Sequence, residues 1–164
     1  MKKFAAHFVF PGNSAPIPKG IVETDTDGTI LRLIHPRNDL QELAGMEFHN
    51  GILCPAFVSL PDPFSPDLFF SYFPELKVFE SFLPDMPTGE KRILEWMKAI
   101  QLTAGRSSLE QLIRQFTYEP ARIGGRLNEL GTLAPGKRPG LILIYKMDYR
   151  NLRLSKDSRL KRLI

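Results

Sequence analysis

Proline limits what the middle of this chain can form. Proline has no backbone N–H and fixes φ, so neither a long helix nor a central strand can run through a proline-rich segment. Within residues 61–87 the prolines are Pro61, Pro63, Pro66, Pro74, Pro84 and Pro87. We therefore expect only short helical turns here, with Pro66 to Phe73 favoured, and longer regular elements on either side.

The same segment is rich in phenylalanine. The 164-residue chain has 12 Phe, and those in this segment are Phe64, Phe69, Phe70, Phe73, Phe79 and Phe82. No chemistry is evident among these rings, but each has a large apolar area to bury. We expect them to form an interaction surface that covers the core of the same chain, or that packs on a second copy as a homodimer or on another protein partner.

The residues before the proline-rich segment have the pattern of strands. Residues 3–10 alternate, which predicts a strand with Phe4, Ala6, Phe8 and Phe10 on one face and Ala5, His7 and Val9 on the other. Gly20 to Asp25 and Thr29 to Ile34 flank Asp27-Gly28, and this pattern predicts a hairpin. Asn50-Gly51 predicts a second turn, between two short strands at 46–49 and 51–54.

Two amphipathic helices are predicted after the proline-rich segment. The first runs from Thr88 to Ala104, with Thr88 as N-cap and Gly105 as stop. Its apolar face is made by Ile93, Met97, Ile100 and Ala104. The second starts in a capping box of Ser107 and Glu110, and its apolar face is made by Leu109, Leu112, Ile113 and Phe116. We expect a short third helix near residues 120–124.

The last third of the chain returns to strands. Leu141 to Tyr145 is a continuous apolar run, which predicts a strand that is buried on both faces. Asn151 to Ser155 and Arg159 to Leu163 predict two more strands. We therefore expect an α+β fold in a single domain, 1–164, with N-terminal strands in 1–60, a Phe/Pro-rich and helical segment in 61–125, and C-terminal strands in 126–164.

Charge and composition exclude several classes of function. The formal charge is +4, and its excess lies in residues 150–164, where basic side chains alternate with leucines as on a half-buried strand. We therefore do not expect a nucleic-acid partner. No apolar run approaches the roughly 20 residues that span a bilayer, and His7 and Pro11 interrupt the first apolar run. We expect a cytoplasmic protein with no membrane partner.

No set of side chains predicts a catalytic or metal site. The chain has only three histidines and one cysteine, and none of them forms a close pair of metal ligands. His49 and Cys54 could form a hydrolase site with nearby acids, but no third group is evident that would orient the base. Cys54 in apolar surroundings favours packing. We expect no catalytic residue, no metal and no cofactor.

Two stretches resemble motifs of the amidohydrolase superfamily. Residues 50–59, NGILCPAFVS, resemble the family's G-x-x-x-x-P-G-F-(V/I)-(N/D). Residues 131–144, GTLAPGKRPGLILI, resemble its G-(S/T)-L-x-P-G-K-x-A-D-(L/I)-x-(V/I)-(L/I), and the helix in 107–124 resembles its last barrel helices. In that family the two chain ends form a composite domain, a small β-sandwich, beside a metal-binding (β/α)₈ barrel that hydrolyses C–N bonds. The resemblance therefore implies a small β-sandwich here, with an inserted segment of two to three helices.

The departures from the family pattern imply that its activity is lost. The family's metal-binding His-x-His pair would fall on Pro61 and Pro63, and Ala56 replaces a glycine. Only about 30 residues bridge the matched regions, whereas a barrel needs about 200 or more. We therefore expect a non-catalytic binding or interaction module. Two alternatives stay open: a partner that completes or regulates an intact amidohydrolase, and a hydrolase with an unrecognised site.

Overall fold

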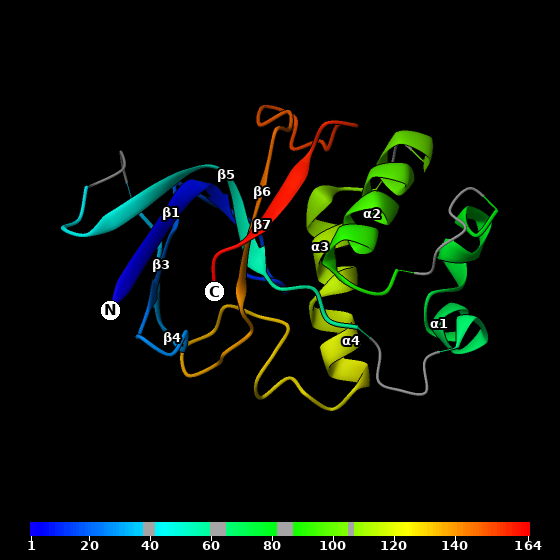
Figure 1. Cartoon of the computed structure of the whole chain (residues 1–164), viewed down its shortest axis with the longest axis horizontal. Coiled ribbons are helices and arrows are strands. Elements are labelled where there is room, and N and C mark those ends of the chain that lie inside the picture. The colour runs from blue at the N-terminus through cyan, green and yellow to red at the C-terminus, as the bar shows by residue number, and fades with distance from the viewer. Residues whose placement is uncertain (38–41, 60–64, 82–86, 105–106) are drawn as a thin grey trace.

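The fold is mixed α+β, with one sheet and the helices packed on one side of it (Figure 1). The computed structural model describes residues 1–37, 42–59, 65–81, 87–104 and 107–164. The strands come from the two ends of the chain, and the helices come from the segment between them. The predicted α+β class and the order of strands, helices and strands are therefore confirmed.

A seven-stranded sheet joins the two ends of the chain. Its order is β4-β3-β1-β5-β6-β7, and β2 pairs with the end of β1. Only the β1–β5 pair is parallel among the paired strands of the described residues. The strands are β1 (Lys2–Val9), β2 (Ile17–Pro18), β3 (Ile21–Thr24), β4 (Ile30–Ile34), β5 (Met46–Pro55), β6 (Leu141–Tyr145) and β7 (Arg159–Arg162).

The sheet has an apolar core on each face. The helix-side core lies between the sheet and the helices and includes Ile52, Cys54, Trp96, Ile142 and Ile144. The outer core lies on the opposite face and includes Phe4, Val22, Ile30, Leu53, Leu133, Leu141 and Leu143. β6 contributes alternate side chains to both cores, so the predicted burial of this strand on both faces is confirmed.

An irregularity in the pairing of β1 with β5 breaks the predicted alternation of β1. Ala6 lies opposite His49, but Phe8 lies opposite Ile52, so β5 carries one extra residue. Phe4 and Ala6 belong to the outer core, whereas Phe8 and Phe10 pack in the helix-side core. The prediction that these four residues share one face is therefore wrong, because the strand does not keep its period of two past Ala6.

The extra residue of β5 falls at the predicted Asn50-Gly51 turn. β5 runs unbroken through this dipeptide, so the predicted turn is wrong. A Cβ atom at Gly51 would overlap the carbonyl oxygen of Ile144 and lie 2.6 Å from Leu143 Cδ1. Glycine is therefore needed here because β6 approaches the backbone of β5 closely, and not because the chain reverses.

The predicted hairpin is confirmed, and one predicted strand is wrong. β3 and β4 pair antiparallel around Gly28, whose φ is +86°. Asn151 to Ser155 does not form a strand, because the Asp148 carboxylate accepts hydrogen bonds from two backbone N–H groups that follow it, and Leu152 has a φ of +51°. The predicted strand at Arg159 to Leu163 is confirmed as β7.

The helices lie on one side of the sheet. They are α1 (Pro66–Tyr72), the 3₁₀ helix η1 (Pro74–Phe79), α2 (Glu90–Ala104), α3 (Leu109–Phe116) and α4 (Tyr118–Ile123). α2, α3 and α4 lie next to the sheet, and α1 and η1 lie beyond them (Figure 1). α1 and η1 each begin at a proline, where the missing N–H costs nothing. The predicted helical turn at Pro66 to Phe73 and the predicted third helix are confirmed.

The caps differ in register from the prediction. α2 begins at Glu90, two residues after the predicted cap Thr88, and its predicted stop, Gly105, lies outside the described residues. The capping box of α3 uses Ser108 and Gln111 rather than Ser107 and Glu110, because the Gln111 amide oxygen accepts from the Ser108 N–H at 3.1 Å. The predicted apolar face of α3 is buried.

We predict that Gly51→Ala lowers the free energy of unfolding by about 2–3 kcal/mol, because the new methyl group overlaps the β6 backbone. Urea denaturation measures this change. The control is Gly136→Ala, which has a φ of +85° but open space around its Cβ position, so it should cost about 1 kcal/mol from backbone strain alone. Equal costs for the two variants would contradict the close-approach role of Gly51.

Candidate binding groove

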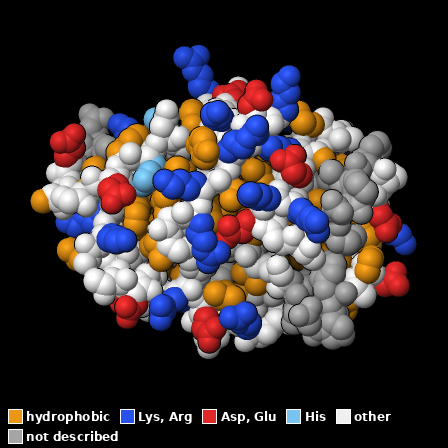
Figure 2. Space-filling view, in the orientation of Figure 1, with side chains coloured by type: hydrophobic (Ala, Val, Ile, Leu, Met, Phe, Trp, Pro, Cys, Tyr) orange, Lys and Arg blue, Asp and Glu red, His pale blue; other side chains and the backbone are white. Residues whose placement is uncertain are grey.

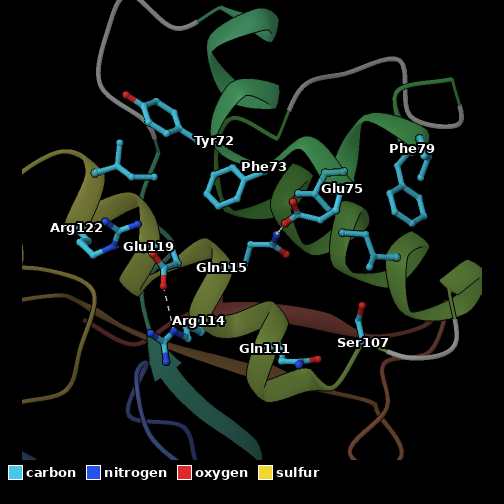
Figure 3. Close-up of a pocket in the computed structure, with 14 residues that line it drawn as sticks. Tyr72, Phe73, Glu75, Phe79, Ser107, Gln111, Arg114, Gln115, Glu119 and Arg122 are labelled. Atoms are coloured by element: carbon cyan, nitrogen blue, oxygen red, sulfur yellow. Dashed lines mark hydrogen bonds and ion pairs between the residues drawn. The ribbon is translucent and has the colours of Figure 1, made fainter.

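A groove lies within the helical layer (Figure 3). α1 and η1 form one wall, α3 and α4 form the other, and α2 contributes Ile100. The volume of the groove is about 650 Å³, within the range of about 300–1,000 Å³ that ligand sites occupy. We take this groove as the candidate functional site.

Aromatic rings hold the first wall on α2. The Phe69 ring lies 5.3 Å from the ring of Phe70, 5.2 Å from that of Phe73 and 5.8 Å from that of Trp96, between centroids. Trp96 belongs to α2 and is 1% exposed. Edge-to-face and tilted contacts of this kind fix the relative orientation of two elements as well as bury area. These ring contacts therefore hold α1 against α2.

Two apolar side chains of this wall are exposed to solvent. Tyr72 is 47% exposed and Val78 is 65% exposed, and both line the groove. In α1 and η1 these exposed side chains lie between buried rings in the sequence, because each helix buries one face and exposes the other. The groove therefore has an apolar wall that remains available for contact.

The opposite wall is polar. Gln115 of α3 reaches across the groove, where its amide Nε2 donates a hydrogen bond of 2.6 Å to Glu75 Oε1 of η1 (Figure 3). Gln111 and Ser107 also line this side. The side-chain bond between the two walls limits how far they can separate.

Glu119 ties α3 to α4 through two arginines. Arg114 Nε donates to Glu119 Oε1 at 3.1 Å, and Arg122 Nε donates to Glu119 Oε2 at 2.8 Å. The Arg114 guanidinium also lies 4.9 Å from the centroid of the Tyr118 ring. Burial by itself would raise the pKa of Glu119, but the hydrogen bonds and positive charges of Arg122 and Arg114 outweigh it and hold the pKa below its ordinary value.

The chemistry of the groove suits binding. Its lining, among the described residues, includes neither histidine nor cysteine, so a hydroxyl nucleophile such as Ser107 has no imidazole to activate it there. Its carboxylates are engaged, Glu75 by Gln115 and Glu119 by two arginines. An apolar wall facing amide and guanidinium donors can hold a ligand by contact and hydrogen bonds.

The predicted Phe interaction surface is only partly accessible in the single chain. Phe69, Phe70, Phe73 and Phe79 are between 3% and 7% exposed and belong to the helix-side core. Phe73 and Phe79 also line the groove. Phe64 and Phe82 lie outside the described residues. The rings of known position therefore pack in the core of their own chain, which was one of the arrangements expected.

His49 and Cys54 do not come together. They are five residues apart on one extended strand, which corresponds to about 16 Å. His49 stacks on Phe4 of the outer core with centroids 6.0 Å apart, while Cys54 is completely buried in the helix-side core. Burial, with a smaller contribution from the charge of Glu90, raises the pKa of the Cys54 thiol, so the thiol stays protonated and unreactive.

The described residues offer no metal site and no membrane-spanning helix. No group of three or more His, Cys, Asp or Glu side chains within them could hold a metal ion. Pro61 and Pro63, where the family's histidines would fall, lie outside them. None of the helices in these ranges has the length and apolar character needed to cross a bilayer.

Comparison of the chain with protein-family models, with curated proteins and with solved structures finds no match. The function of the chain must therefore be inferred from its own residues.

The polar side of the groove was missed by the sequence prediction. Arg114, Glu119 and Arg122 lie on two helices, and their contact depends on the break of the chain at Thr117. Glu119 and Arg122 are spaced as a helical ion pair, and this spacing is the one sequence pattern that could have predicted the contact. No sequence pattern predicts the bond from Gln115 to Glu75, because the two residues are 40 positions apart.

We predict that Glu119→Gln lowers the free energy of unfolding at neutral pH by about 0.5–1 kcal/mol, because it removes a charge held by two arginines. The pKa of Glu119 is lower in the folded chain than its ordinary value, so its contribution is full above the ordinary pKa and is lost as the pH falls through the folded value. Urea denaturation at pH 7 and below pH 4 should show the two proteins converging in acid.

The matched control is Glu129→Gln, which removes a carboxylate from an ion pair with Arg126 in which both side chains are more than half exposed. It should change stability little at either pH. A Glu119→Gln deficit that persists unchanged in acid would show that packing, and not charge, is responsible.

Proposed function

We propose that this chain is a non-catalytic binding module with an amidohydrolase-like β domain, and that it binds a polypeptide partner in the groove. The observation that carries the proposal is the pairing of β5 with β6. These strands hold the two stretches that resemble amidohydrolase motifs, and they run antiparallel with Ile52 opposite Ile144 and Pro55 opposite Leu141. Segments from the two chain ends are therefore neighbours, as the family's composite domain requires.

The outer core supports the finer proposal of a small β-sandwich. Its side chains come from strands on both sides of β5, and the loop before β6 adds Leu133. That loop also bonds to the first strands: Leu133 N donates to Pro11 O at 2.9 Å, and Gly136 N donates to Ile30 O at 2.8 Å. The second motif therefore packs against the edge of the sheet formed by β4 and covers the outer core, as one layer of a β-sandwich covers the other.

The proposal of a non-catalytic role is supported by what lies between the motifs. Within the described residues, the chain between β5 and β6 forms helices and no strand. A (β/α)₈ barrel needs eight parallel strands, and its catalytic residues lie at the ends of those strands. The helices instead cover the helix-side core, where Val58 N donates to Phe116 O at 2.9 Å directly after the first motif.

A polypeptide is the proposed partner because of the make-up of the groove. Tyr72 and Val78 offer exposed apolar contacts on one wall, and Arg114 and Arg122 offer donors on the other. Aromatic and arginine side chains are the types enriched where proteins bind each other, and apolar contact surrounded by polar groups is the usual plan of such surfaces. The same groove could accept a segment of a second copy.

We predict that Val78→Asp weakens peptide binding by about tenfold or more, because a carboxylate then replaces an apolar contact in the groove. Short peptides are selected from a random display library on the purified wild-type chain, and their affinities are measured by calorimetry. The control is Leu102→Asp, an equally exposed apolar residue on α2 that does not line the groove. It should leave the affinity unchanged.

Two results would overturn the groove proposal. One is that no peptide is selected, while light scattering at high concentration also shows a monomer. The other is that the selected peptides bind both variants as well as they bind the wild-type chain. A dimer that Val78→Asp dissociates and Leu102→Asp does not would identify the partner as a second copy of this chain.

We predict that the purified chain carries no stoichiometric zinc and does not hydrolyse amide or cyclic-amide substrates with or without added zinc. Emission spectrometry measures the metal content, and product formation measures the hydrolysis. An added-zinc control with an intact amidohydrolase shows that the assay detects the activity. Zinc at one equivalent together with hydrolysis would overturn the non-catalytic role.

A further inference from the structure

A second cleft, separate from the groove, lies between α2 and the C-terminal end of the sheet. Its volume is about 580 Å³, and it shares no lining residue with the groove. Among the described residues it is lined by one carboxylate, Glu95, and by the cations Lys91, Arg92, Lys98, Lys156 and Arg159. The whole chain carries a formal charge of only +4, so positive charge is concentrated here.

Side-chain contacts hold the walls of this cleft in place. Arg162 Nη1 of β7 donates to Glu90 Oε1 at the start of α2, at 2.7 Å. Lys98 Nζ donates to the carbonyl of Lys156 at 3.3 Å. β7 and the turn before it are therefore each joined to α2 by a side-chain hydrogen bond.

Lys98 is the unusual group in this cleft. Its side chain is only 5% exposed and forms an ion pair with Glu95. Its ammonium donates to Glu95 Oε1 at 2.7 Å and to the Lys156 carbonyl, and an ammonium has three N–H donors. One donor of a buried cation therefore has no protein acceptor in the described residues. A buried charge that lacks part of its hydrogen bonding favours an added acceptor.

Two of the exposed cations of the cleft have no carboxylate partner among the described residues. Lys91 and Lys156 are exposed and form no ion pair with a described residue. Arg159 Nη1 donates to the carbonyls of Lys156 and Ser158, which keeps its guanidinium at the turn. Figure 2 shows Lys and Arg side chains, with Asp and Glu side chains among them, on the face that carries α2 and β7.

We propose that this cleft binds a small molecule that carries a phosphate or pyrophosphate group. Lysine ammonium and arginine guanidinium groups are the side chains that bind phosphate oxygens, as point charges and as planar donor pairs respectively. The phosphate accepts the remaining Lys98 donor, and the apolar side chains of Leu94 and Leu160, which also line the cleft, contact the rest of the molecule. The volume matches a ligand of this size.

The lining favours a small ligand over a nucleic acid. Proteins that bind single strands combine a cationic track with aromatic side chains on which the bases stack. The lining of this cleft has no aromatic side chain among the described residues. Its cations also converge between one helix and one turn, and do not follow an extended path along the surface.

Calorimetry of the full chain at low salt tests the proposal, with inorganic pyrophosphate and ADP as probes and adenosine as the phosphate-free control. Pyrophosphate and ADP should bind, and adenosine should not. Lys91→Gln combined with Lys156→Gln should weaken both by about tenfold or more, because two charged donors are lost. The matched control combines Lys2→Gln with Lys77→Gln, exposed lysines on β1 and η1, and should change affinity by less than about twofold.

All four lysines are exposed, so the variants should fold, and circular dichroism checks this. The proposal is overturned if the wild-type chain binds neither phosphate probe. It is also overturned if both double variants lose affinity equally, which would indicate bulk charge alone. A third contrary result is a short single-stranded DNA that binds more tightly than ADP and responds to the same variant, which would indicate a nucleic-acid surface. None of these results depends on Val78 or on peptide binding in the groove.

Discussion

The close pairing of β5 with β6 holds the two halves of this protein together. Gly51 lets the two backbones approach, and Ile52 to Pro55 then exchange hydrogen bonds with a strand that begins at Leu141. Through this pair, the sheet from the start of the chain continues into the sheet from its end. Both apolar cores include side chains of β5 and β6. Loss of the β5–β6 pairing would therefore disrupt both apolar cores at once.

The helical layer follows from that sheet, because the helix-facing side of β5 and β6 is apolar and must be covered. Prolines divide the segment before α2 into short pieces. α1 packs the rings of Phe69 and Phe70 against Trp96 of α2, and η1 buries Leu76 and Phe79. Short helices cannot pack along their full length as long ones do, so they leave space between them. The groove is this space, with exposed Tyr72 and Val78 on one wall and the arginines of α3 and α4 on the other.

The two clefts differ in the physical basis of recognition. The groove pairs apolar contact with hydrogen-bond donors, and its charges are largely neutralised within the wall by Glu119. The cleft beside β7 instead has two exposed lysines, Lys91 and Lys156, that form no ion pair with a described residue, and a buried ammonium that bonds to Glu95 and to the Lys156 carbonyl. Both clefts depend on α2, which contributes Ile100 to one and Lys98 to the other. One helix thus supports two surfaces of different chemistry.

The sequence by itself determined what depends on local patterns. Period-two and helical spacing placed most of the strands and helices, the Asp27-Gly28 hairpin and the two-faced strand at Leu141 to Tyr145, because these patterns reflect burial along a single element. The tertiary structure alone decided what depends on contacts between distant residues. It made Asn50-Gly51 a point of close approach and not a turn, since β6 lies beside it, and it turned Phe8 toward the helices. It also assembled both clefts, because Gln115 meets Glu75 and Lys98 meets Lys156 only after the chain has folded.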